Sequence, residues 1–481
     1  MLSADKPQVG LHGDATALAS AIARSGLTAK AAMEAALAAA ERDKALGALA
    51  IFLPSLGLEE ADAVDGLRET TPEAVSSPPF AGVPCLAKDL GGPFAGIPVH
   101  AGSRALADHT DAAADSDLAR RFRKAGFCFF GSTTVPEFGL SLSGEPAMGP
   151  VCRNPLAPDR SAGGSSSGAA AAVAAGIVAI AHATDAGGSI RVPAACCGLV
   201  GLKPTRGMLP GGPDFGNHLG GIASEFAVCR STRDAELALL HLTGEAKGPF
   251  ADPGMGKIAA SDALCVGVLT DTGDLPLDGD RRQAVIEAAA TLEADGHRIV
   301  RLGWNAFSTM VRDSNEVFAQ IVSVNLAQLF ETLRLDPDKT EPLTRAFLER
   351  GRGCPATALW DALQKGVKVS YALWTLFEEI DVLLTPMLTS PPPLLGSFPT
   401  DHGDVDAHLE RMAAFAPLAT LANVSGAPAL TLPFGADAEG LPLPVQLMAA
   451  MGGDRLLLTL AARLEREERW RQPFPVAGLT T

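Results

Sequence analysis

Apolar and polar positions near the N-terminus follow a helical period. Residues 14–49 predict two helices broken at Ser25 and Gly26, with Thr28 as the N-cap of the second helix. Residues 55–78 are acidic and then rich in serine and proline, which predicts a helix followed by a surface loop. The chain therefore begins with a helical layer.

Beyond Phe80 the pattern changes to short apolar runs that alternate with helical segments. Residues 81–90 predict a strand that includes a lysine, residues 116–126 an amphipathic helix, and residues 128–134 a buried strand. This β, α, β order is typical of a mostly parallel sheet.

The same alternation returns in the second half of the chain. Residues 305–379 are mainly helical, and we expect Trp360, Tyr371 and Trp374 in the packing of these helices. The other predicted elements are strands at 264–269, 297–302, 381–385, 429–432 and 445–448 and helices at 280–295 and 454–468.

The domain organisation follows from these elements. The 481 residues exceed the usual size of one domain, but there is no internal repeat and no linker long enough to demand two. We predict one α/β domain over 1–481, with a large, mostly parallel mixed sheet covered by helices on both faces. Its parts are an N-terminal helical layer (1–60), a central core (80–210) and a later region (305–415) that begins mainly helical.

Composition narrows the range of partners and compartments. A formal net charge of −16 repels nucleic acid and anionic lipid, so we expect neither as a partner. The eight cysteines show no CxxC pair, which argues against a zinc ribbon or a disulfide framework and favours a reducing cytoplasm. The first residues have no apolar signal core, and the apolar run 169–183 suits tight packing inside a protein.

The candidate chemistry lies between Ser161 and Thr205. Two small-residue loops, 163–168 and 186–189, flank an alanine-rich helix and a short strand, and both loops carry hydroxyl groups. Glycines there allow the backbone to approach a ligand closely. Two glycines before Ser189 allow consecutive N–H groups to converge on an oxyanion, although a glycine turn with a capping serine remains the simpler interpretation.

The sequence near Ser189 offers no histidine that is expected to act as its general base. His182 precedes Ser189 by seven residues on a predicted strand, where a core or strand-end role is expected. The chain has no GxSxG elbow near Ser189, and GGSSSG lacks the GK[ST] of a phosphate-binding loop.

The motifs GGSSSG and DAGGSIRVPAACCGLVGLKPT, with AKD upstream, resemble the amidase signature family of serine hydrolases. The resemblance covers about residues 14 to 470. It implies the amidase signature fold, a catalytic core over 80–210 and a substrate pocket formed partly by 305–415.

The resemblance also implies roles for single residues. Lys88 matches the catalytic lysine, Ser165 the bridging serine and Ser189 the nucleophile, with a cis peptide between Gly164 and Ser165. The backbone N–H groups of Ala186, Gly187, Gly188 and Ser189 match the oxyanion hole.

The chemistry of this triad sets a condition on Lys88. To accept a proton near pH 7 its amine must be neutral, so its pKa must fall by roughly three units from about 10.4. Burial beside apolar neighbours lowers the pKa of a lysine, whereas a nearby carboxylate raises it. Asp89 must therefore point away from the amine or be paired elsewhere.

Other residues of the central stretch are expected to support the site. Asp185 and Arg191 flank the nucleophile, and we interpret them as supports rather than as a surface ion pair. Ser166 is a lesser candidate hydroxyl. Cys196 and Cys197 are expected in buried packing rather than as a redox pair.

The resulting hypothesis is an amidohydrolase that cleaves a small or oligomeric amide through an acyl-Ser189 intermediate, with no metal and no cofactor. Its partner is a small-molecule amide, a homodimer stays open, and bacterial amidases that open cyclic amide dimers look similar. The alternatives are the glutaminase subunit of a tRNA-dependent amidotransferase, and an esterase or aryl acylamidase of the same family. Residues 411–426 contain no Asp or Glu to hold the amino group of glutamine, which disfavours the glutaminase.

Overall fold

The computed structural model describes residues 13–24, 26–71, 78–109, 112–212, 218–244, 253–254 and 263–479. The strands are β1 (Leu49–Phe52), β2 (Val83–Lys88), β3 (Phe127–Thr133), β4 (Arg153–Asn154), β5 (Ala157–Ser161), β6 (Ile180–Asp185), β7 (Val200–Lys203), β8 (Ser224–Cys229), β9 (Cys265–Leu269), β10 (Arg298–Leu302), β11 (Val382–Pro386), β12 (Ala429–Ala436) and β13 (Pro442–Ala449). The helices are α1 (Ala15–Arg24), α2 (Ala29–Arg42), α3 (Pro54–Thr70), α5 (Asp117–Lys124), α6 (Ser167–Ala174), α7 (Arg191–Cys196), α8 (His218–Gly221), α9 (Thr232–Leu242), α10 (Gly279–Ala294), α11 (Ser308–Leu333), α12 (Pro342–Arg352), α13 (Ala356–Leu376), α14 (Val405–Phe415), α15 (Ala419–Ser425) and α16 (Asp454–Glu465).

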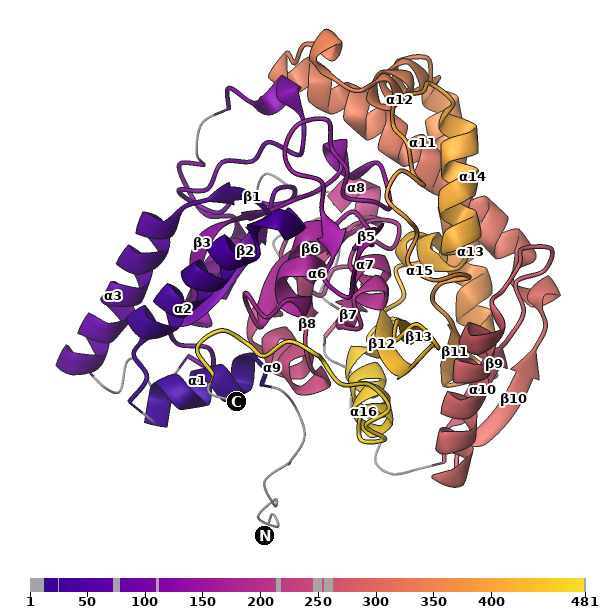
Figure 1. The fold of residues 1–481 in the computed structure, drawn as a ribbon. Helices are drawn as coiled ribbons and strands as arrows, with labels where there is room; N and C mark the ends of the chain where they lie inside the picture. The colour runs from indigo at the N-terminus through magenta and orange to yellow at the C-terminus, as the bar shows by residue number, and fades with distance from the viewer. Residues whose placement is uncertain are drawn as a thin grey trace.

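The N-terminal helices pack beside a small sheet of order β1-β3-β2 (Figure 1). The Thr28 hydroxyl accepts a hydrogen bond from the Ala31 N–H and caps α2, as predicted, and Gly26 makes the preceding turn at φ +77°. Ser25, the other residue of the predicted break, lies outside the described residues. β2 runs parallel to β3 and ends at Lys88.

The large sheet has eight strands in the order β10-β9-β11-β13-β12-β7-β8-β6. It is mixed, as predicted, but only the β10–β9 and β9–β11 pairs are parallel, and the other neighbouring pairs are antiparallel. The expectation of a mostly parallel sheet is therefore corrected. Short turns such as Asp437–Gly440 between β12 and β13 allow only antiparallel pairing of the strands that they join.

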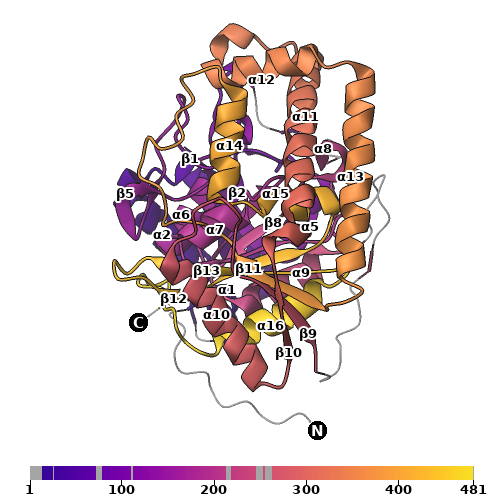
Figure 2. The same cartoon turned by 90° about the vertical axis from the view of Figure 1, so that its right-hand side faces the viewer.

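Apolar side chains on the two faces of this sheet belong to two cores. Val382 and Leu384 of β11 pack into the core that contains the buried sides of α10 and α16, whereas Leu383 packs into the core beneath α11 and α15. This alternation is what a strand buried on both faces requires. Figure 2 shows α11, α13 and α14 standing side by side over one end of the sheet.

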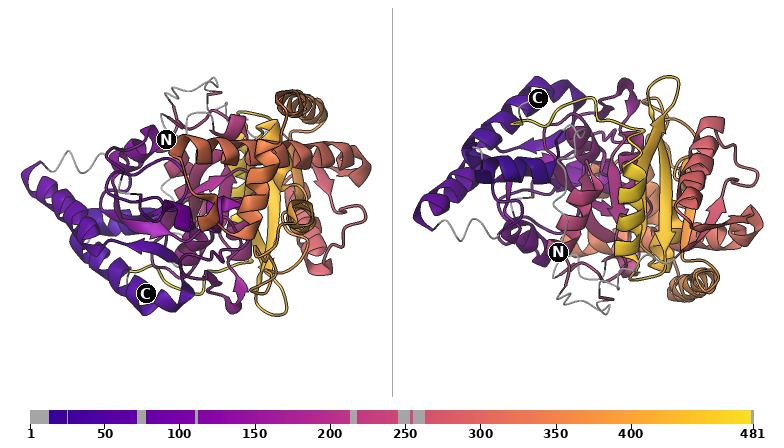
Figure 3. Two further views of the ribbon diagram at one scale, coloured as in Figure 1. Left: turned by 90° about the horizontal axis from the view of Figure 1, so that it is seen from above. Right: turned by 90° about the horizontal axis from the view of Figure 1, so that it is seen from below.

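The last residues of the chain return to its beginning. The Ala477 N–H donates to the Gly176 carbonyl, and Leu479 contacts Gly13. Figures 1 and 3 show this segment running from α16 towards the N-terminal helices. It therefore ties the N-terminal layer to the sheet.

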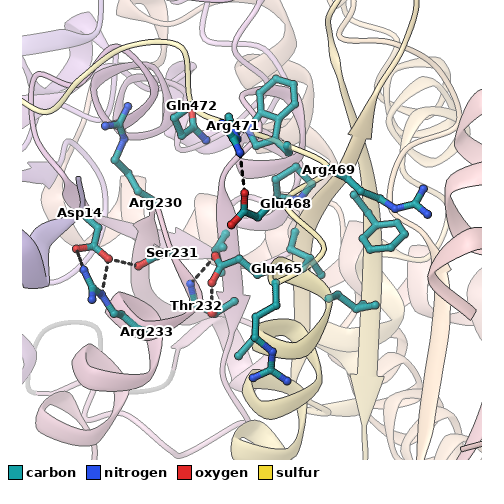
Figure 4. A pocket seen from close by; sticks show the side chains of 18 of the residues that line it. Asp14, Arg230, Ser231, Thr232, Arg233, Glu465, Glu468, Arg469, Arg471 and Gln472 are labelled. Carbon is teal, nitrogen blue, oxygen red and sulfur yellow. Dashed lines mark hydrogen bonds and ion pairs between the residues drawn. The ribbon is translucent and has the colours of Figure 1, made fainter. Parts of the chain in front are cut away.

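A cavity of about 380 Å³ lies beside this segment (Figure 4). Its charged side chains are largely paired with one another: Arg233 binds Asp14, Arg471 binds Glu468, and Thr232 donates to Glu465. The Arg233–Asp14 pair joins α9 to the residue before α1, and the Thr232–Glu465 contact joins α9 to α16.

The prediction that Trp360, Tyr371 and Trp374 pack inside the helical region is wrong. They lie on α13 with exposed fractions of 63%, 74% and 51%. α13 buries its opposite side through Ala362, Val369 and Leu373, so the aromatic residues face solvent.

Among the described residues, no helix is long and apolar enough to cross a membrane.

Replacing Gly176 with alanine tests the anchoring of the C-terminal segment. Gly176 has φ +76°, and an added Cβ would lie 1.9 Å from the Pro475 carbonyl oxygen. We expect Gly176→Ala to lower the free energy of unfolding by about 3 kcal/mol, measured by urea denaturation. Gly26→Ala is the matched control, since Gly26 has φ +77° and open space around it. It should cost about 1 kcal/mol, and equal losses in both variants would contradict the role of the contact.

Candidate active site

Lys88 lies at the end of β2, where its amine meets the loop before α6 and strand β6. Lys88 Nζ lies 2.9 Å from Ser165 Oγ, 2.7 Å from Thr184 Oγ1 and 3.3 Å from the Thr184 carbonyl oxygen. The Lys88 backbone N–H donates to His182 Nδ1, so His182 has the predicted core role and holds β2 beside β6.

The surroundings of Lys88 favour its neutral form. The side chain is buried, and loss of hydration lowers its pKa to about 7, although the negative charges of Asp185 and Glu225 oppose that shift. The amine can therefore lose and regain a proton near neutral pH.

Asp89, the nearest carboxylate in sequence, is engaged elsewhere. Its oxygens accept hydrogen bonds from the backbone N–H groups of His100 and Gly102. Burial raises the pKa of Asp89 to about 6, while these hydrogen bonds oppose the rise. The condition set by the sequence, that Asp89 be paired away from Lys88, is met.

The loop that carries Ser165 is bound to the loop that carries Ser189. The peptide between Gly164 and Ser165 is cis, and the Ser166 N–H donates to the Ser189 carbonyl at 3.1 Å. Ser166 Oγ donates to the Thr184 carbonyl, so this hydroxyl is held against β6. Ser165 and Ser189, by contrast, both line a cavity.

Residues 186–189 form the turn between β6 and α7. Ala186, Gly187 and Ser189 line the same cavity as Ser165. The Gly188 N–H instead donates to Asp185 Oδ1 at 2.7 Å, and Gly188 has φ +109°. Gly188 therefore allows the turn by adopting a positive φ, and its N–H is bound to Asp185 rather than directed into the cavity.

A buried ion pair supports this turn from below. Arg191 Nε and Nη2 donate to the two carboxylate oxygens of Asp185 at 3.0 Å each, and both side chains are inaccessible to solvent. Burial alone would raise the pKa of Asp185, but the Arg191 charge and hydrogen bonds from Arg191, Asn423 and Gly188 hold it well below its usual range. The carboxylate is therefore charged and fully engaged, as a support rather than a surface pair.

Two supports were missed by the sequence analysis. Asn423 Nδ2 donates to the carbonyl and the carboxylate of Asp185, and Thr184 binds the Lys88 amine. Thr184 immediately precedes Asp185, and Asn423 lies in an ANVSG motif, but neither position has a spacing that indicates its contact.

The cavity beside Ser165 and Ser189 has a volume of about 600 Å³. Phe138, Phe318 and Leu326 are among its apolar walls, and Asn325 and Gln328 add amide groups. The described residues that line it include no Asp, Glu, Lys or Arg. Much of the wall comes from α11, with Leu409 and Met412 from α14.

No group of three or more His, Cys, Asp or Glu side chains is arranged to hold a metal ion in the described part of the chain. All eight cysteines are free thiols, and Cys196 and Cys197 are buried, with pKa values raised by burial. Both are packed as expected.

The chain is similar over most of its length to known amide hydrolases. The family model described as Amidase matches residues 31–458. AmiC of Mycobacterium tuberculosis is 35% identical over 471 residues, which covers 95% of each chain. The 6-aminohexanoate-cyclic-dimer hydrolase of Paenarthrobacter ureafaciens is 32% identical over 440 residues, covering 82% of this chain and 85% of that protein. A solved structure of 6-aminohexanoate cyclic dimer hydrolase with substrate superposes with a TM-score of 0.87 at 31% identity, covering 97% of this chain and 99% of that one.

Removing the Asp185 carboxylate should destabilise the protein strongly. Asp185→Ala leaves the Arg191 guanidinium buried without its counter-charge, which should lower the free energy of unfolding by about 3–5 kcal/mol. Urea denaturation measures this loss. Arg312→Ala is the control, because it breaks an exposed pair with Asp313 and should cost at most about 1 kcal/mol. Similar losses in both variants would contradict the supporting role.

Proposed function

Because the chain belongs to the amidase signature family of hydrolases, which act on the C–N bonds of amides, we propose that it cleaves uncharged carboxamides through an acyl intermediate on Ser189. The observation that carries the proposal is the contact between the buried Lys88 amine and Ser165 Oγ, at 2.9 Å beside the cavity.

In the proposed acylation step, Ser189 Oγ attacks the amide carbonyl carbon. Its proton passes to Ser165, whose own proton passes to neutral Lys88. The backbone N–H groups of Ala186, Gly187 and Ser189 are available for the developing oxyanion, since these residues line the cavity. Gly188 is omitted from this set because its N–H is bound to Asp185.

Breakdown of the tetrahedral intermediate needs the reverse transfer. Protonated Lys88 returns a proton through Ser165 to the leaving nitrogen, so that ammonia or an amine departs rather than an amide anion. Water then attacks the acyl-Ser189 ester, with the same lysine and serine accepting its proton. The carboxylic acid is released and Ser189 Oγ regains its proton.

The lining of the cavity supports a neutral, largely apolar substrate. A charged substrate would lose hydration among walls such as Phe138, Phe318 and Leu326, and the described lining residues include no Asp, Glu, Lys or Arg to pair with it. Free glutamine carries two charges and is therefore disfavoured. Cyclic and linear oligoamides without free charges fit this chemistry, and the similarity to a hydrolase named for a cyclic dimer is consistent with it.

A panel of amides tests the substrate class and the nucleophile. Purified protein should release ammonia or amine from neutral apolar amides with a kcat/KM at least about 100-fold above that for glutamine. Ser189→Ala should lower this rate by about 10⁴-fold or more. Ser308→Ala, at the start of α11 and outside the cavity lining, is the control and should retain the rate. Turnover of glutamine as fast as of neutral amides would exclude the proposed substrate class, and an active Ser189→Ala variant would exclude the nucleophile.

The pH dependence tests Lys88. Since only neutral Lys88 accepts a proton and its pKa is lowered to about 7, kcat/KM should rise with pH through a midpoint near 7. Lys88→Ala should lower kcat/KM by about 10²–10⁴-fold and remove this rise. Lys203 is the matched control: burial and the nearby Arg191 charge also lower its pKa to about 7, but its amine donates to the Pro204 carbonyl. A rise that survives in Lys88→Ala but vanishes in Lys203→Met would reassign the base.

A further inference from the structure

Helix α13 carries a stripe of large exposed side chains that the proposed active site does not use. The stripe consists of Trp360, Val367, Tyr371 and Trp374, and Val367 is 64% exposed. The sequence has only four tryptophans and one tyrosine. Two of those tryptophans and the tyrosine thus gather on one solvent-facing side of one helix, where burial does not explain them.

The spacing of the stripe is symmetric. With Leu363, which is partly buried at the same side, the positions are 360, 363, 367, 371 and 374, separated by three, four, four and three residues. Reversing the direction of the helix about Val367 therefore gives the same spacing of apolar positions. An antiparallel copy of α13 would set Trp360 opposite Trp374, Tyr371 opposite Leu363, and Val367 opposite Val367.

Nothing else on the described surface offers a matching partner. The other large apolar side chains that are exposed lie singly on different elements, as Leu67 does on α3 and Ile286 on α10. A lipid surface is also a poor match, because the chain carries a net charge of −16. α13 stands at the outer edge of the molecule in Figure 2, so a second helix can reach it.

We infer that α13 is the contact of a two-fold symmetric homodimer, in which the stripes of two copies pack antiparallel with Val367 at the axis. A two-fold axis is the closed arrangement that covers a self-complementary stripe on both copies. Tryptophan and tyrosine are the residue types that dominate the binding energy of such contacts.

The area available is consistent with a dimer of ordinary size. The three aromatic side chains are each more than half exposed, and each offers on the order of 100–150 Å² of solvent-accessible area for burial in a dimer. Together with Val367 and the flanking Gln364, Lys368 and Thr375, the stripe approaches the roughly 800 Å² per partner that is typical of stable interfaces.

Sedimentation of the full chain tests the inference. Wild-type protein should sediment with the mass of two chains at micromolar concentration. Val367→Glu and Val367→Lys should each raise the dissociation constant of the dimer at least about 30-fold, because each places like charges opposite one another at the axis. An equal mixture of the two variants should recover the dimer, since the axis then joins glutamate to lysine.

Two controls keep the result specific to α13. Ile286→Glu introduces the same charge at an isolated exposed position and should leave the dimer intact, while far-ultraviolet circular dichroism should show that all variants keep their helix content. A monomeric wild type overturns the inference, as does a dimer that persists in both single variants. A monomeric wild type that co-sediments with phosphatidylcholine vesicles would assign the stripe to a membrane surface instead. The inference is independent of the proposed function, because no stripe residue lines the cavity.

Discussion

The burial of one amine, that of Lys88, is the constraint on which the rest of the site depends. Burying an ammonium group in an apolar interior costs hydration free energy. That cost favours the neutral amine and lowers the pKa of Lys88 to about 7. Two buried carboxylates, Asp185 and Glu225, work against that shift. Each carboxylate is hydrogen-bonded to another partner, Asp185 to Arg191 and Glu225 to the backbone N–H of Gly92.

The same constraint connects the catalytic turn to the shape of the cavity. Asp185 holds the N–H groups of Gly188 and Ile190 and thereby sets the turn that presents Ser189. Arg191 extends the network to Gln446 on β13 and to Asn423 on α15, so the turn is fixed by elements more than 200 residues away. The described lining of the cavity includes no Asp or Glu, and a carboxylate facing Lys88 would favour its protonated form.

Local pattern was a sound guide to several of the helices and strands. The cap at Thr28, the strand that ends at Lys88 and the helical region after residue 305 all follow from short-range periodicity and capping chemistry. The pattern could not determine the direction of strand pairing, since a buried strand looks alike in parallel and antiparallel neighbours. It also failed for Trp360, Tyr371 and Trp374, because residue type alone does not reveal which side of α13 packs against α11 and α15.

By itself, the sequence determined many of the helices and strands and the family resemblance, and that resemblance implied Lys88, Ser165 and Ser189 as the candidate triad. The elements depend on residue type and local spacing, whereas the triad depends on motifs matched to the family. Only the tertiary structure decided that Asp89 turns away from Lys88, that Thr184 and Asn423 support the site, and that the Gly188 N–H belongs to Asp185. These are contacts of single atoms, and their geometry is set by packing between segments that lie far apart in the chain.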